Sequence, residues 1–91
     1  MAKVRIPQQL RPEAAGEREL YGPGKTVLEV FDSLRENYPR LVGRVIGEGG
    51  EIHRYVNVYV DDDDIRYIGG LGAAVEDGSV ISLIPAVAGG V

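Results

Sequence analysis

The chain has no cysteine among its 91 residues. This absence excludes a disulfide framework, a thiolate zinc site and a cysteine nucleophile. Any sulfur chemistry performed by this protein must therefore use a group other than a side-chain thiol.

The chain also has no run of Lys or Arg, and its net charge is −4. A nucleic-acid-binding surface needs clustered positive charge, so we expect no nucleic-acid partner. The N-terminus lacks the apolar core of a signal peptide, and no stretch approaches the roughly 20 apolar residues of a membrane helix. We therefore expect a cytoplasmic, soluble protein of one domain, with no membrane partner.

The first half of the chain predicts two strands and one helix. Residues 2–7 alternate apolar and charged side chains, as a half-buried strand does, and end at Pro7. After a polar loop, residues 18–21 predict the second strand of a hairpin. Thr26 is a favourable N-cap, and Glu29 completes a capping box for a helix that we expect Pro39 to stop.

The second half predicts two or three further strands. Alternation over residues 54–60 puts three valines on one face of a strand. The four aspartates at 61–64 predict a turn, and residues 65–68 a short strand. The last strand, residues 79–84, ends at Pro85 and has apolar residues on both faces, which is typical of a central strand buried on both sides.

This order of elements predicts an α+β fold, a mixed sheet of four to five strands with one main helix packed across it. We expect the domain to occupy residues 1–85 and a flexible C-terminal tail to occupy residues 86–91.

Three tempting motifs have simpler interpretations. The stretch GPGKT at 22–26 is similar to the end of a phosphate-binding loop, but Glu19 stands where that motif needs glycine. The aspartates at 61–64 lack the spacing of a calcium loop. His53 is the only histidine, so it is more simply a surface or strand-edge residue than a metal ligand, and we expect no metal site and no bound cofactor.

The tail AVAGG, followed by Val91, is the most informative stretch. Gly89 and Gly90 have no side chain, so their backbone can approach a partner closely and adopt almost any conformation. A tail of this kind suits a chain that threads into a narrow active site of another protein. The reactive group would then be the terminal carboxylate, which becomes an acylating agent once AMP is attached to it.

The element order, the turn EDGSVISLIP and the end PAVAGG resemble the ubiquitin-like β-grasp sulfur carriers, which include the small subunit of molybdopterin synthase and the thiamine sulfur carrier. The stretch IHRYVNVYVDDDDIRYIGGL, with DGSVISLIPAVAGG after it, is most similar to the carriers of thiocarboxylate-dependent cysteine synthesis in actinobacteria. The resemblance covers nearly the whole chain.

This resemblance implies a protein cosubstrate without catalytic side chains. Gly90 would be adenylated with ATP and converted to a thiocarboxylate by a sulfur donor, and Gly89 would give passage through the partner's channel. The implied partners are an adenylating enzyme of the ubiquitin-activating type, a pyridoxal-phosphate cysteine synthase and a metal-dependent peptidase. Carried over by position, the docking residues would include an open sheet face and the tail: Ile84, Tyr55, Tyr59, Ala86, Val87 and Ala88. The same carry-over places Ile81 and Leu83 in the core, with Val4, Ile6, Val30, Leu34, Val56 and Val58.

Val91 departs from the family, whose mature members end on the second glycine. We expect a peptidase to remove it, and the sequence leaves open whether it is a native precursor residue or was added in cloning. Other functions also stay open: a sulfur carrier for molybdopterin, thiamine or tRNA thiolation, a ubiquitin-like protein modifier, or an interaction module with an inert tail.

Overall fold

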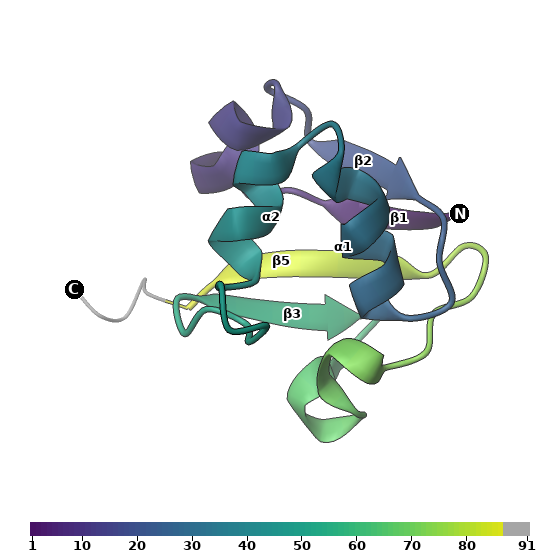
Figure 1. Ribbon diagram of the computed structural model, residues 1–91. Helices are drawn as coiled ribbons and strands as arrows, with labels where there is room; N and C mark the ends of the chain where they lie inside the picture. The colour runs from purple at the N-terminus through teal and green to yellow at the C-terminus, as the bar shows by residue number, and fades with distance from the viewer. Residues whose placement is uncertain (87–91) are drawn as a thin grey trace.

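A five-stranded mixed sheet forms the framework of the protein (Figure 1). The computed structural model describes residues 1–86. In spatial order the strands are β2 (Glu19–Gly22), β1 (Ala2–Arg5), β5 (Val80–Pro85), β3 (Val56–Val60) and β4 (Asp63–Asp64). β1 and β5 run parallel, whereas the other neighbouring strands are antiparallel. The predicted α+β fold with a mixed sheet is confirmed, and so is the hairpin of the first two strands.

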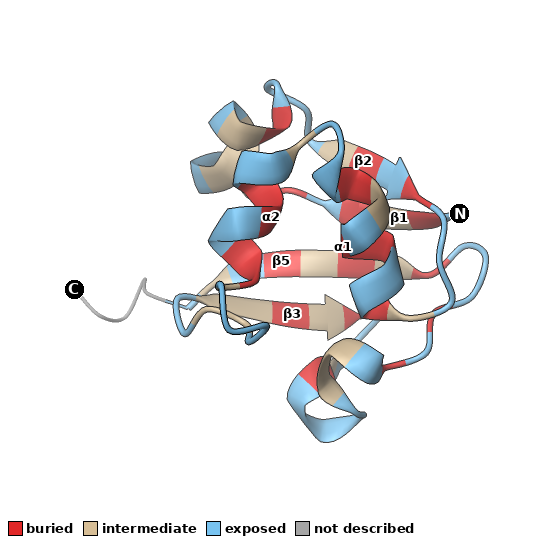
Figure 2. Ribbon diagram, in the orientation of Figure 1, coloured by how far each residue is buried: buried red, intermediate tan, exposed pale blue. Residues whose placement is uncertain are grey.

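The last strand, β5, lies at the centre of the sheet, as predicted, but only one of its faces is covered. Ile81 and Leu83 are buried under the helices, and Figure 2 shows buried and less buried residues alternating along the strand. On the other face Ile84 is 44% exposed. The expectation that β5 is buried on both sides is therefore wrong, because both α-helices pack on the same face of the sheet (Figure 1).

The predicted helix is α1 (Val27–Arg35), and its start is fixed by side-chain hydrogen bonds. The amide of Glu29 donates to Thr26 Oγ1 at 3.2 Å, as a capping box requires. Glu29 Oε1 in turn accepts from the amide of Lys25 at 2.8 Å, one residue before the usual position. The apolar stripe of the helix, headed by Phe31, is buried against the sheet.

A second α-helix, α2 (Pro39–Val45), was not predicted. The sequence interpretation took Pro39 as the stop of the first helix, but that helix already ends at Arg35. Proline suits the first turn of a helix, since the amide hydrogen that it lacks has no partner there. The prediction of one main helix is therefore corrected to two α-helices on one face of the sheet.

Short 3₁₀ helices replace two other predicted segments. The expected polar loop after β1 contains η1 (Gln8–Ala14), which buries Ala14. Residues 65–68, predicted as a strand, instead begin η2 (Ile65–Tyr67), and the short strand β4 lies within the aspartate run. Asp64 explains this shift, because its side chain accepts from the amide of Arg66 at 2.9 Å and caps the helical turn. A third turn, η3 (Gly70–Gly72), completes this connection.

The core lies between the sheet and the two α-helices. Its buried members include nearly all of the residues that the resemblance placed there: Val4, Ile6, Val30, Leu34, Val58, Ile81 and Leu83. Val56 is partly buried and packs against this cluster. α2 adds three buried residues, namely Leu41, Val42 and Val45.

Candidate functional site: the root of the C-terminal segment

The end of β5 carries the chain toward its C-terminal residues and is held by β3 on one side. Pro85 lies opposite Val56 in the antiparallel pair, and the amide of Ala86 donates to the carbonyl of Tyr55 at 2.8 Å. These bonds fix the backbone up to the last described residue. We call residues 84–86 the tail root. Val87, Ala88, Gly89, Gly90 and Val91 lie outside the described residues.

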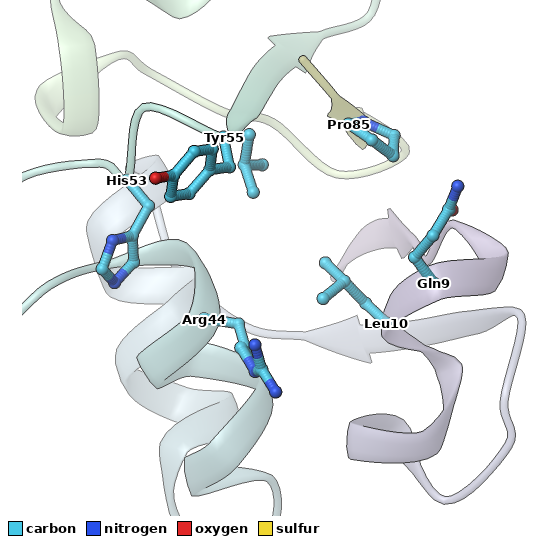
Figure 3. A pocket seen from close by; sticks show the side chains of 7 residues that line it. Gln9, Leu10, Arg44, His53, Tyr55 and Pro85 are labelled. Carbon is cyan, nitrogen blue, oxygen red and sulfur yellow. The ribbon is translucent and has the colours of Figure 1, made fainter. Parts of the chain in front are cut away.

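A cavity of about 440 Å³ opens beside the tail root on the helix-covered side of the sheet (Figure 3). Four separate segments line it, with Gln9, Leu10, Arg44, His53, Tyr55, Val56 and Pro85. Most of the wall is apolar. The guanidinium of Arg44 supplies a positive charge, and Arg44 and His53 both supply hydrogen-bond donors. We call this cavity the root pocket.

His53 ties the segment before β3 to α2. Its Nε2 lies 3.0 Å from the carbonyl oxygen of Gly43, and its backbone amide donates to the carbonyl of Val45 at 2.9 Å. A carbonyl oxygen can only accept, so Nε2 carries the hydrogen and, in the neutral ring, Nδ1 is the free acceptor. The sequence interpretation expects a surface or strand-edge residue here; in the structure His53 is half-buried, between the isolated bridge at Ile52 and the start of β3.

The open face of the sheet holds a second hollow, of about 540 Å³. Residues from three neighbouring strands and the β3–β4 turn line it, with Arg5, Tyr59, Asp61, Asp62, Val80, Ser82 and Ile84. The structure thus brings Ile84 and Tyr59 together, as expected. Tyr55, 61% exposed, instead lines the root pocket, so the expected trio is divided between the two faces. The docking role of all three stays a prediction.

The aspartate run at 61–64 forms turns and caps. A hydrogen bond from Arg66, 2.7 Å between Nη2 and Oδ2, lowers the pKa of the Asp64 carboxyl and raises the pKa of the Arg66 guanidinium. Asp61 Oδ1 accepts from the amide of Val80 at 3.1 Å and so joins the turn to β5. Within residues 1–86, no group of three or more acidic, His or Cys side chains is arranged to hold a metal ion.

The glycines of GPGKT serve close packing against α1. A Cβ at Gly22 would lie 2.7 Å from Ser33 Oγ, and one at Gly24 would lie 2.7 Å from the amide nitrogen of Val30. In a phosphate-binding loop the backbone amides point at the phosphate. Here the amide of Lys25 instead donates a hydrogen bond to Glu29 Oε1. The geometry supports the interpretation of this loop as a turn that leads into a capped helix.

Sequence reasoning missed the root pocket. Arg44 belongs to α2, which the sequence does not predict, and Gln9 and Leu10 belong to η1, where the sequence predicts a loop. Leu10, an apolar residue in a polar stretch, was the one signal that this loop packs against the domain.

A model of the ThiS family matches residues 4–90 of the chain. The chain belongs to the ThiS family. The sulfur carrier protein CysO of Mycobacterium tuberculosis is 40% identical over 89 residues, which cover 96% of each chain. Its crystal structure has a TM-score of 0.88 to this protein. CysO in the Amycolatopsis orientalis BexX/CysO complex has a TM-score of 0.90 at 40% identity, covering 97% of this chain and 98% of that one.

These matches confirm the ubiquitin-like β-grasp fold and the resemblance to sulfur carriers. Another relative is the small archaeal modifier protein 3 of Haloferax volcanii, 36% identical over 86% of this chain and 87% of that protein. The names of these ThiS-family relatives thus describe carriers and modifiers. Among the residues that the structure describes, no helix is long and apolar enough to cross a bilayer.

Proposed function

We propose that this ThiS-family protein is a sulfur carrier for cysteine synthesis, with the Gly90 carboxyl as its working group. The observation that carries the proposal is the similarity to CysO over 96% of both chains, at 40% identity. The match to the ThiS family model ends at Gly90, which supports Gly90 as the functional terminus.

The proposed chemistry takes place at one carbonyl. An oxygen of the Gly90 carboxylate attacks the α-phosphorus of ATP, pyrophosphate leaves, and an acyl-adenylate results. A hydrosulfide equivalent from the sulfur donor then attacks the carbonyl carbon and expels AMP, which leaves a thiocarboxylate. Both steps are performed by an adenylating enzyme of the ubiquitin-activating type. The carrier's contribution is to present a glycine terminus from a fixed root, since glycine lets the backbone pass closely by an active-site wall.

The tail root supports this role by its position. The amide of Ala86 donates to the carbonyl of Tyr55, directly before β3, so the docked domain determines where the last residues start. The root pocket lies beside this start on one face of the sheet, and the second hollow reaches it through Ile84 on the other face. Each hollow contains an arginine that a partner could contact. In the crystal structure of the BexX/CysO complex a CysO protein is assembled with a second protein, which agrees with a carrier that works through partners.

In cysteine synthesis the thiocarboxylate sulfur would form a bond to the β-carbon of an activated serine held by a pyridoxal-phosphate enzyme, the activated serine oxygen would leave with its activating group, and a thioester would result. Acyl transfer then gives a carrier with cysteine amide-linked to Gly90, and a metal-dependent peptidase cuts this bond. The same type of peptidase would remove Val91, because both substrates have an amide bond after Gly90. Until that bond is hydrolysed, the Gly90 carbonyl has no carboxylate oxygen to adenylate.

Intact mass spectrometry of protein from its native host tests the proposal. The expected species are a chain without Val91, a fraction heavier by the replacement of one oxygen with sulfur, and a fraction carrying one cysteine. A chain that keeps Val91 and never gains sulfur would contradict the carrier function.

The small archaeal modifier similarity supports a second candidate, a modifier joined through Gly90 to lysines of other proteins. Both candidates share the activation step and differ in the nucleophile. Peptides carrying a Gly-Gly remnant on lysines of other proteins, without any thiocarboxylate, would favour the modifier. Thiocarboxylate without the cysteine adduct would favour a carrier for molybdopterin, thiamine or tRNA thiolation.

A further inference from the structure

The chain contains only two lysines, Lys3 and Lys25, against eight arginines. An activated carboxyl is attacked by amines, whereas a guanidinium stays protonated and is not acylated near neutral pH. The two lysines and the N-terminal amine of Met1 are therefore the amines that could capture the activated Gly90 of the same chain. Their places in the fold decide whether such capture occurs.

The three residues that carry these amines lie at the end of the molecule where β5 begins. Lys3 lies opposite Val80, the first residue of β5. The Met1 amine is 2.9 Å from Asp77 Oδ1, and the carbonyl of Lys25 accepts from the amide of Val75. Both contacts therefore involve the segment that leads into β5. Figure 1 shows the N-terminus and the β2–α1 connection at the end opposite to the tail root.

The amine of Lys3, where the structure places it, lies beyond the reach of the tail. Six residues of strand separate Val80 from Ala86, which is about 20 Å at the rise of a β-strand. Four fully extended residues after Ala86 carry the Gly90 carbonyl at most about 14 Å. Lys3 is moreover directed away from β5, because its Nζ is paired with Glu19 of β2, which lies on the other side of β1, at 3.7 Å.

In the two hollows beside the tail root, the cations are the arginines Arg44 and Arg5. Arg44 lines the root pocket together with Pro85 (Figure 3). Its Nη2 is 3.6 Å from Glu13 Oε2. His53 also lines this pocket, but an acyl group on imidazole is itself activated and returns to water or sulfide. The tail root is thus surrounded by groups that form no stable amide.

From this placement we propose that the fold protects the activated C-terminus from its own amines, and that this protection requires a side chain without an amine at position 44, where the chain has arginine. The proposal rests on the proposed function. The prevented reaction is attack of a lysine amine on the Gly90 carbonyl, with loss of AMP and a proton and formation of an internal amide. The activated carbonyl then persists until the partner enzyme delivers sulfide.

The test uses residues 1–90 with a C-terminal thioester, made by intein fusion, at about 10 µM and mildly alkaline pH. Intact mass distinguishes the free acid, formed by hydrolysis, from the internal amide, which is lighter by one water. The wild type should give the free acid. Arg44→Lys should give the internal amide, mapped to position 44 by peptide mass spectrometry, since effective concentrations within one chain reach about 1 mM, some hundredfold above a second molecule.

Two control variants make the result specific. Arg44→Gln also loses the pair with Glu13 but adds no amine, so it should hydrolyse like the wild type. Lys3→Arg combined with Lys25→Arg should leave the wild-type product unchanged. Internal amide in the wild type, or none in Arg44→Lys, would overturn the proposal. Because the thioester is installed chemically, either result is independent of whether the host forms a thiocarboxylate.

Discussion

Replacing Gly24 by alanine should destabilise the protein by about 3 kcal/mol. The added Cβ would lie 2.7 Å from the amide nitrogen of Val30 and 2.8 Å from the Cβ of Glu29, and the backbone φ at this glycine is +150°. The amide of Val30 belongs to α1 and cannot rotate away. Forcing an extra carbon into a packed site costs about 1–3 kcal/mol, and an unfavourable backbone conformation costs about 1–3 kcal/mol.

Thermal unfolding followed by circular dichroism measures this loss. At about 4–8 °C per kcal/mol for a domain of this size, Tm should fall by about 12–24 °C. Gly43→Ala is the matched control, because a Cβ there meets nothing within 4 Å and alanine favours a helix interior, by about 0.5–1 kcal/mol. Well below its Tm, folded Gly24→Ala should still form a thiocarboxylate. A Gly24→Ala protein as stable as wild type would refute the packing argument, and a stable but inactive one would reopen the phosphate-loop interpretation.

The other predictions concern the helix cap, the core, the open face and the pH dependence. Thr26→Ala should lower the free energy of unfolding by about 1 kcal/mol in urea, and Thr26→Ser by much less, because serine keeps the capping hydroxyl. Phe31→Ala should cost about 3–5 kcal/mol in the same assay, since its side chain is fully buried; a cost below about 1 kcal/mol would contradict the described core. Ile84→Asp should leave stability within about 0.5 kcal/mol but lower kcat/KM of adenylation; unchanged kinetics would remove Ile84 from the docking surface. Because Arg66 lowers the folded-state pKa of Asp64, this carboxyl stabilises the fold above its unfolded pKa of about 4, and the effect is lost as pH falls through the folded pKa. The stability difference between wild type and Asp64→Asn should therefore be larger at pH 7 than in strong acid; a difference independent of pH would contradict the pairing.

Local patterns predicted the elements whose stability is local. The alternation in β3 and the Thr26 cap each depend on neighbours within a few residues, so the sequence shows them directly. α2 was missed because Pro39 both ends and begins helices, and only the packing of Leu41 against the core decides between the two. The prediction of a strand at 65–68 was wrong because the side chain of Asp64 accepts a hydrogen bond from the amide of Arg66. This cap stabilises a helical turn more than the strand propensity of these residues favours a strand.

Part of the candidate site could be predicted from the sequence, and part of it could not. Gly89 and Gly90 are visible in the sequence because their chemistry lies in the backbone and its end. The root pocket is not visible, because it joins segments as distant as Leu10 and Pro85, and their meeting depends on the whole topology. Tyr55 is an example of a residue whose place in the fold the strand pattern does not determine. It precedes the first residue of β3, so strand alternation does not determine the face on which it lies.

The position of β5 has a consequence for how the protein is made. The central strand, β5, is the last of the five strands to be synthesised, whereas β1, its parallel neighbour, is the first. Pairings between such distant segments form late, because a long loop must close first. The sheet can therefore assemble only when the segment bearing the tail root has been synthesised. An enzyme that recognises the folded sheet would then meet only chains that already carry this segment, and folding itself would show that all five strands have been made before activation.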